Sequence, residues 1–426
     1  MKVYINFYII FNLVALVYSQ EIQQISYNKF LATSINQFNT LPSGNLVIKD
    51  FKGNISIIGN GENKISVKRK TFINVFSKEK ALSILEHSMK INDTEEENGR
   101  KTIFIESNIE TINILNDNLE IKLPNNFSIS ARSNNGNLSI IFIQGKINIS
   151  NSCGNIDLEN LSGKFSILSS DGKVTGSQIN GNVSISSENG SIQLKYLQGT
   201  LNAKTSYGDI TAKNILGNIT AKTYNGKIDL VNISGKKIYV QTKKGDLTAK
   251  EILGKNTIDL HVREGNISLE DLDGNLETST LIGEISLRNI KGNTKVWNTT
   301  GNINAHYIFG SFIAKSSLGD ISLSKIWGQL NNDHQIDLKT STGNIDIFLP
   351  NDFPAKFTVY ARDQGRRSRD VIISDFPLNI KISSGISIAK GKNSNGLYKI
   401  NLETNSGFIK IKSSKMLIQE KISQLH

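Results

Sequence analysis

Glycine recurs at every ninth position over much of the chain, and this spacing constrains the fold more than any other feature of the sequence. One run extends from Gly136 to Gly235 and a second from Gly265 to Gly328, with irregular steps between them at Gly245 and Gly254. A short fixed period is typical of repeat proteins, in which each unit contacts only its neighbours. The spacing therefore predicts one repetitive architecture rather than several unrelated domains.

The full repeat is eighteen residues long, because two kinds of nine-residue half alternate. In one half, apolar residues stand two, four and seven places after the glycine, as in Gly208-Asp-Ile-Thr-Ala-Lys-Asn-Ile. In the other half a hydroxyl residue stands six places after the glycine. The apolar seventh place holds Leu161, Ile179, Leu197, Ile215, Ile233, Ile252, Leu272, Ile290, Ile308 and Ile326, and the hydroxyl place holds Ser169, Ser187, Thr205, Thr223, Thr280 and Ser316.

Strand geometry explains this pattern. Successive side chains of a strand point to opposite faces, so Ile210 and Ala212 are expected in the core and Thr211 in water. Glycine, often after Asn or Asp, supplies the positive φ that a corner requires. Such short strands cannot enclose a core within one coil, so successive coils must stack. The sequence predicts an all-β parallel β-helix with 18-residue coils; a β-propeller is disfavoured because its blades need about 40 residues.

The first residues have the pattern of a secretory signal peptide. A positively charged start precedes the apolar run 5–17, and Ser19 stands just before the expected cleavage ahead of Gln20. An uncleaved membrane anchor is the alternative, although a bilayer span needs about 20 apolar residues and this run is shorter. No second hydrophobic segment follows. We therefore expect a signal peptide over 1–19 and a secreted protein without a membrane span.

The repeat occupies only the middle of the chain, and both ends of a solenoid need covers because open edges invite aggregation. We expect an N-terminal cap over 20–135, the regular solenoid over 136–343, and C-terminal strands with a cap over 344–426. Leu82, Leu85 and Met89 predict one amphipathic helix over 77–90. Further strands are expected over 102–106, 379–388 and 397–411.

Cysteine content and net charge restrict how the fold is stabilised and which partners the protein binds. Cys153 is the only cysteine, so no intrachain disulfide forms, and burial must stabilise the fold. It is expected in a turn; an intermolecular disulfide is the alternative. The net charge of +11 favours acidic polysaccharides or cell-surface glycans as partners in a secreted protein, rather than nucleic acid. An ordinary soluble surface is the alternative, and self-association stays open in both cases.

The sequence carries no pattern typical of an active site. Asp209, Asp246 and Asp320 share the place after the glycine, but the coil between the first two has Lys227 there. The five histidines are scattered and show no metal-ligand spacing. We therefore predict no catalytic, cofactor-binding or metal-binding residue and a non-enzymatic protein. A polysaccharide lyase or hydrolase, of the kind that other solenoids carry, is the less favoured alternative.

Lysines predict the one candidate binding surface. Lys195 and Lys213 share an outward place in adjacent coils, as do Lys204 and Lys222 in the other half-repeat. Coils stack about 4.8 Å apart, so a polyanion along such a strip would relieve the repulsion between like charges. A solvated lysine face is the alternative.

Two kinds of modification motif also occur. Arg366 and Arg369 lie in a dense basic stretch that could be a processing site, a loop for an anionic ligand, or a solvated loop. Asn-x-Ser/Thr acceptors predict a glycoprotein if the source glycosylates, although the repeat itself places Asn before Ile-Ser. These acceptors are Asn54, Asn92, Asn126, Asn137, Asn148, Asn160, Asn182, Asn189, Asn218, Asn232, Asn266 and Asn298.

The repeat unit resembles that of the bacterial-type adhesin families of β-solenoid proteins. The matching features are Thr205-Ser-Tyr-Gly-Asp-Ile-Thr-Ala, Ser316-Ser-Leu-Gly-Asp-Ile-Ser-Leu, and strands that end in proline at Pro124 and Pro350. The resemblance covers roughly residues 40–412. It implies a right-handed β-helix and supplies no catalytic residue. We therefore expect a secreted, adhesin-like binding scaffold; a structural extracellular coat or matrix protein is the second interpretation.

Overall fold

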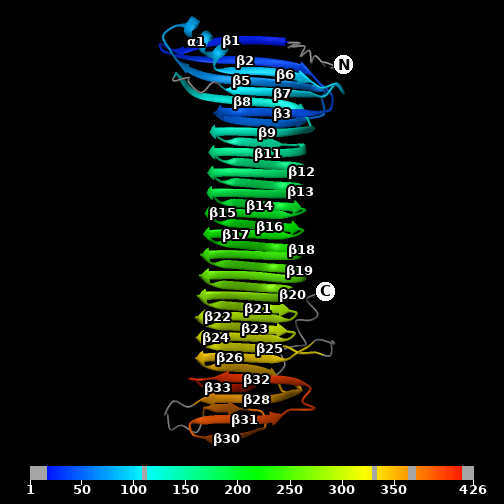
Figure 1. Ribbon diagram of the computed structural model, residues 1–426, viewed down its shortest axis with the longest axis vertical. Coiled ribbons are helices and arrows are strands. Elements are labelled where there is room, and N and C mark those ends of the chain that lie inside the picture. Colours follow the sequence, from blue (N-terminus) through cyan, green and yellow to red (C-terminus); the bar gives the residue numbers. More distant parts are fainter. Residues whose placement is uncertain (1–16, 108–112, 329–332, 363–370, 415–426) are drawn as a thin grey trace, which may run out of the picture. The chain divides into compact units, whose positions relative to one another are not determined.

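The computed structural model describes residues 17–107, 113–328, 333–362 and 371–414 (Figure 1). Residues 1–16 of the expected signal peptide, and Arg366 and Arg369, lie outside these ranges. The chain divides into two compact units, residues 1–199 and 200–426, and each is considered by itself. Strands dominate the described part of both units, and a single helix is found there.

The N-terminal unit contains coils that stack through parallel pairing. Ile147 of β11 lies beside Phe165 of β12, and Phe165 lies beside Val183 of β13, each step being one repeat of eighteen residues. The first coil comes from β3 and β4, which pair with β9 and β10. The strands of this stack are β3 (Ser43–Lys52), β4 (Asn54–Asn60), β9 (Asn126–Asn135), β10 (Leu138–Ile141), β11 (Gln144–Cys153), β12 (Ile156–Asp171), β13 (Val174–Asn189) and β14 (Ile192–Gln198).

The cap of this unit replaces parallel pairing by antiparallel pairing. β1 pairs with β2, β2 with β5 and β5 with β8, all antiparallel, and β8 then pairs parallel with β4 of the first coil. This sequence of strands covers the end of the parallel stack, as edge protection requires. The strands of the cap are β1 (Val17–Ser26), β2 (Lys29–Asn39), β5 (Lys64–Asn74), β6 (Met89–Glu95), β7 (Lys101–Ser107) and β8 (Ile114–Pro124).

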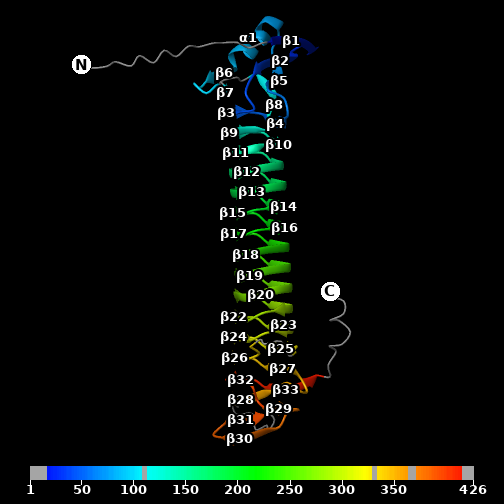
Figure 2. The same ribbon diagram turned by 90° about the vertical axis from the view of Figure 1, so that its right-hand side faces the viewer.

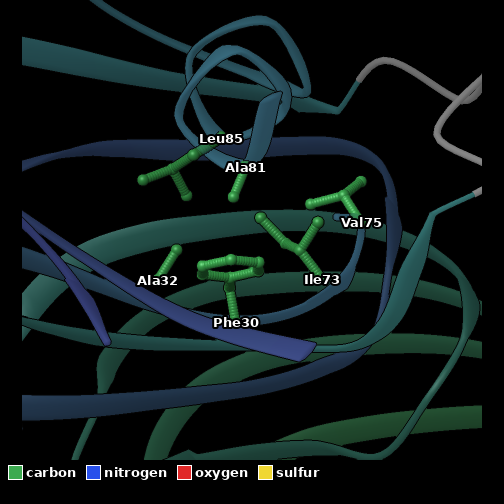
Figure 3. Packing of buried hydrophobic residues seen from close by; sticks show 6 residues of the cluster. All are labelled: Phe30, Ala32, Ile73, Val75, Ala81 and Leu85. Atoms are coloured by element: carbon green, nitrogen blue, oxygen red, sulfur yellow. The ribbon is translucent and has the colours of Figure 1, made fainter. Parts of the chain in front are cut away.

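Helix α1 (Lys78–His87) lies on the cap. The Ser77 side chain accepts a hydrogen bond from the backbone N–H of Lys80, so it acts as the N-cap. Ala81 and Leu85 face Phe30, Ala32, Ile73 and Val75 in one apolar cluster (Figure 3). The helix is shorter than the predicted range 77–90, because Ser88 caps it and Met89 already belongs to β6.

A buried ion pair fixes the cap strands to one another. The Arg69 guanidinium donates to both carboxylate oxygens of Asp117, with Nη2 2.6 Å from Oδ2. The Thr71 hydroxyl donates to the same carboxylate at 2.9 Å, and Arg69 Nη1 lies 3.4 Å from the Leu85 carbonyl oxygen of α1. A bidentate pair with further partners is the arrangement in which buried charges are tolerated.

The C-terminal unit repeats the two half-coils as two sheets. β15 and β17 lie on one side of the stack and β16 on the other (Figures 1 and 2). Ile210, Ala212 and Ile215 of β16 are buried, as the sequence predicts. The strands of these coils are β15 (Leu201–Tyr207), β16 (Ile210–Leu216), β17 (Ile219–Asn225), β18 (Ile228–Lys244), β19 (Leu247–Glu264), β20 (Ile267–Ile282), β21 (Ile285–Lys291), β22 (Thr294–Thr300), β23 (Ile303–Phe309), β24 (Phe312–Leu318), β25 (Ile321–Lys325), β26 (Ile336–Thr342) and β27 (Ile345–Pro350).

The hydroxyl residues of the second half-coil point inward. Thr223 is buried, and its hydroxyl donates to the carbonyl oxygen of Gly208 at 3.0 Å. Thr280 makes the same bond to Gly265 at 3.1 Å. These two threonines donate to corner carbonyl groups, whereas the hydroxyls of Ser169, Ser187 and Ser316 at the same place have no hydrogen-bond partner among the described residues. Threonine at this place therefore has a structural role that serine does not share.

A local bulge explains why the last apolar residue of the first half-coil stands seven places after the glycine instead of six. The residue at the sixth place adopts a left-handed conformation, with φ 56° at Asn214 and 59° at Tyr307. This outward bulge uses one extra residue and returns the chain inward at Ile215 and Ile308. Asn tolerates this conformation well, whereas Tyr does so at a cost.

The final coil departs from this pattern. Lys325 occupies the sixth place without a positive φ, and its register partner is Ile308, the seventh-place residue of the preceding coil. Lys325 is consequently 3% exposed, whereas Ile326 is only half-buried. The prediction that Ile326 enters the core is therefore wrong, because the missing bulge turns the preceding residue inward.

The chain ends its regular coils with β27, whose last residue is Pro350, and then makes a detour before it returns to the stack. β28 (Ala355–Arg362) pairs antiparallel with β31 (Ile386–Lys392), which pairs with β30 (Leu378–Ser383). β32 (Tyr398–Thr404) and β33 (Ile409–Ser414) then lie parallel on β26 and β27. β29 (Ile372–Ser374) pairs with β33. The detour thus supplies a cap for the last coil.

These observations confirm the predicted all-β solenoid with parallel coils. Its handedness, and the predicted limits of the caps at 135 and 344, stay predictions. Across the described ranges, no helix is long and apolar enough to cross a membrane.

Candidate ligand-binding surface

Lys204 and Lys222 lie side by side on neighbouring coils of the C-terminal unit. They are register partners in the parallel pair of β15 and β17, and the flanking residues Ala203, Ala221, Thr205 and Thr223 are buried. Alternation along the strand therefore directs both ammonium groups to the outer face. Among the described residues, no carboxylate lies within ion-pair distance of either lysine.

The other two predicted lysines have different surroundings. Lys213 belongs to β16, on the opposite sheet from Lys204, and its Nζ lies 3.6 Å from a carboxylate oxygen of Asp229. Lys195 is exposed on β14 of the N-terminal unit, with its Nζ 4.8 Å from the ring centroid of Tyr196. The two belong to different units, so their predicted pairing stays a prediction.

Tyrosine rings lie beside the lysines of this part of the C-terminal unit, and the repeat pattern did not predict them. Lys222 Nζ lies 4.9 Å from the ring centroid of Tyr239, and Lys243 Nζ lies 4.7 Å from that of Tyr224. The rings of Tyr207 and Tyr224 are 6.2 Å apart. We call Lys204, Lys222, Lys243, Tyr207, Tyr224 and Tyr239 the tyrosine–lysine face.

An inserted residue brings Tyr239 to this face. The corner after Gly235 contains one residue more than the regular repeat, and the register of β17 and β18 follows it: Thr220 pairs with Tyr239 and Lys222 with Gln241. Strict counting by eighteen would place Val240 beside Lys222. The irregular step at Gly245 is the sequence signal that indicates the shift.

A second unusual group of side chains is buried near the end of the C-terminal unit. The Lys325 ammonium donates to the Gly310 carbonyl oxygen. His334 is 0% exposed, and neither of its ring nitrogens has a hydrogen-bond partner among the described residues. Its ring packs edge-on against Phe309 and Tyr398, with centroids 5.3 and 5.1 Å away, and against Trp327 and Phe353.

This environment opposes charge on both groups. Burial lowers the pKa of Lys325 to about 7, although the nearby Asp333 carboxylate acts in the opposite direction. Burial, and then the positive charge of Lys325, lower the pKa of His334 to about 4. The group is enclosed, so it offers no accessible surface for a ligand.

Several carboxylates of the solenoid accept hydrogen bonds within and between the coils. Asp209 accepts a hydrogen bond from the backbone N–H of Lys227 at 2.7 Å, and Asp246 and Asp320 accept from Asn266 and Asn344 in the same way. Asp229 accepts from the Thr248 hydroxyl at 2.8 Å, and Asp157 from that of Thr175. In the described ranges, no group of three or more His, Cys, Asp or Glu side chains is arranged to hold a metal ion.

The glycosylation acceptors and the cysteine are mostly at the surface. Asn92, Asn126, Asn137, Asn182, Asn189, Asn218, Asn232 and Asn266 are exposed, whereas Asn54, Asn148 and Asn160 are half-buried. Asn298 is different: it is 6% exposed, and its Nδ2 donates to the carbonyl oxygens of Gly283 and Gly301. Cys153 is exposed and free at a corner, as expected for a turn residue.

The stacked parallel coils place this chain among the β-solenoid proteins, and comparison with known proteins defines its family. The Toastrack DUF4097 family model matches residues 43–231 and 213–412, so most of the chain is covered. The chain belongs to the Toastrack DUF4097 family, which has no assigned function.

Comparison with individual proteins adds little to the family assignment. No curated protein matches the chain. Among solved structures, the chain is similar to a "putative cell adhesion protein" from Clostridium sporogenes at 10% identity. The match covers 90% of this chain and 100% of that one, with a TM-score of 0.18.

Proposed function

We propose that this chain is a secreted, non-enzymatic binding or adhesion scaffold that presents its solenoid sheets to acidic polysaccharides or cell-surface glycans. The observation that carries the proposal is the register pairing of Lys204 with Lys222 on an outer sheet face, without a neighbouring carboxylate among the described residues. Two like charges about 4.8 Å apart repel each other, and an anionic chain lying across them removes that repulsion.

The net charge supports the same class of partner. The chain carries +11 overall, and a positive surface attracts polyanions before any contact forms. Attraction of this kind is screened by salt. A scaffold that binds through such contacts needs no reaction chemistry, in keeping with the turn-bonded carboxylates of the coils.

The test measures binding of heparin and polygalacturonate to the purified mature chain at several salt concentrations. Binding should weaken steeply as salt rises. The variant K195Q/K204Q/K213Q/K222Q should bind at least about tenfold more weakly. Salt-independent binding, or unchanged binding by this variant, would remove the proposal.

A matched control distinguishes a site from general attraction. Lys146 and Lys164 are register partners on β11 and β12 of the N-terminal unit, and both are exposed. K146Q/K164Q removes the same charge as K204Q/K222Q but leaves the tyrosine–lysine face intact. We expect a small effect of the first and a large effect of the second. Equal effects would show that only total charge matters.

Secretion is tested separately. The mature protein should appear in the culture medium with Gln20 at or near its N-terminus, as N-terminal sequencing would show. Intracellular protein that retains Met1 would count against secretion.

A further inference from the structure

The tyrosine–lysine face combines positive charge with exposed aromatic rings. Tyr207 is 55% exposed and Tyr224 is 47% exposed, although both are large side chains that burial would favour. Tyr224 and Lys222 lie on one strand, and Tyr239 and Lys243 lie on the next strand across. Cations and rings therefore lie close together on neighbouring coils.

Two of the three lysines of this face, Lys222 and Lys243, contact aromatic rings instead of carboxylates. Lys222 stands over Tyr239 and Lys243 over Tyr224, in cation–π contacts. Elsewhere in the same unit, Lys213, Lys244 and Lys250 each lie within ion-pair distance of a carboxylate. An aromatic ring leaves the positive charge uncompensated, so these ammonium groups remain able to bind an external anion.

From this arrangement we infer that the tyrosine–lysine face binds an acidic saccharide chain, whose sugar rings stack on Tyr207, Tyr224 and Tyr239 while its carboxylate or sulfate groups pair with Lys204, Lys222 and Lys243. A sugar ring has an apolar C–H face that packs on an aromatic face, and charged substituents at its edge. The inference rests on the proposed function, and it names the residues and the ligand class that the function requires.

The repeat distance favours a saccharide over a nucleic acid. Coils follow one another at about 4.8 Å, a step comparable to the length of one pyranose unit in a chain. Stacked bases follow at about 3.4 Å, so successive bases do not match successive coils. A uronate or sulfated chain along the stacking direction can therefore meet one coil per sugar.

The closing experiment compares ligands and variants of the purified mature chain by calorimetry. The probes are heparin-derived oligosaccharides, oligogalacturonate, inorganic polyphosphate and oligo(dT). Variant Y224L/Y239L keeps every charge but removes two rings, and Y224F/Y239F keeps the rings. We expect Y224L/Y239L to bind an acidic oligosaccharide about tenfold more weakly, with Y224F/Y239F close to the unaltered chain.

Further readouts separate ring stacking from charge. Polyphosphate, which has no sugar ring, should bind both tyrosine variants equally, and near-UV circular dichroism of the tyrosines should change on saccharide binding only. Equal saccharide binding by Y224L/Y239L, combined with loss in K204Q/K222Q, overturns this inference but preserves the proposed function. Absence of binding to every acidic saccharide overturns both, and tighter binding to oligo(dT) than to the saccharides overturns this inference. Far-UV circular dichroism checks that each variant remains folded.

Discussion

Two titratable side chains in the C-terminal unit, Lys325 and His334, lie in surroundings that disfavour their charged forms. Lys325 occupies the inward place of a strand whose neighbours there are apolar, and Gly310 supplies one carbonyl acceptor. His334 has aromatic rings around it and no hydrogen-bond partner in the described ranges. Charge at these positions costs folding free energy unless the proton is released.

The first prediction is that the C-terminal unit loses stability as pH falls. The folded-state pKa of His334 is about 4, below its usual 6.5, so the unfolded chain binds the extra proton between these values. Stability therefore falls by roughly 3 kcal/mol as pH decreases from about 6.5 to about 4. Lys325 acts in the same direction between about 10.5 and about 7, since its folded-state pKa is lowered to about 7.

Urea unfolding across the pH range measures this dependence. Lys325→Met keeps the size and the apolar stem but removes the titratable amine, so its stability should vary less between pH 7 and 10. At pH 7 and below it should also be more stable than the unaltered chain. A variant with the same pH profile as the unaltered chain would show that Lys325 is not the titrating group.

At the scale of the coil, we predict that the Thr223 hydroxyl contributes measurably to the free energy of unfolding. Replacing Thr223 by Val keeps the shape but removes the hydroxyl that donates to the Gly208 carbonyl oxygen. We expect a loss of about 1–2 kcal/mol in the free energy of unfolding. Thr211→Val is the control, because Thr211 lies between two buried residues on the outer side of β16. Chemical denaturation measures the free energy of unfolding of both variants. Equal decreases in the two variants would contradict the structural role of Thr223.

The coil is also where the sequence is most informative. Alternation at Ile210 and Ala212 predicts burial correctly because a strand has only two faces. Alternation does not explain why the next buried residue after the fourth place stands at the seventh place and not at the sixth. The sixth place holds a left-handed residue, such as Asn214, and several residue types adopt this conformation there, so no single residue type indicates it. Burial of Lys325 was not predictable in this way, because its local sequence does not indicate that the bulge is missing.

The candidate site was predictable only in part, for a related reason. Lys204 and Lys222 are eighteen residues apart, so counting predicts their pairing, which the register shows. Tyr239 reaches the same face only because one corner holds an inserted residue. Register is a property of pairing between strands, and a single insertion moves every later side chain relative to the preceding coil.

On the scale of the whole molecule, the repeat places some N-glycan acceptor asparagines at the surface and one of them in a buried position. The repeat places most of these asparagines on the outer side of a corner or strand, and Asn92, Asn126 and Asn182 are exposed. Asn298 instead fills the buried place that Thr223 and Thr280 fill in other coils. An N-glycan is attached through Nδ2, and in Asn298 this atom donates to two corner carbonyls, at 3.0 and 2.8 Å.

The last prediction follows from this difference. When the chain is produced in a secretory pathway that adds N-glycans, the folded protein should carry glycans at exposed acceptors such as Asn92 and Asn126 and none at Asn298. A glycan there would remove both corner hydrogen bonds and force a bulky polar group between buried coils, so modified chains should fail to fold and be retained. Glycopeptide mass spectrometry of secreted and retained protein measures occupancy site by site. Full occupancy at Asn298 in soluble, cooperatively folding protein would contradict its burial, whereas Asn92→Gln should remove one glycan without changing the unfolding midpoint.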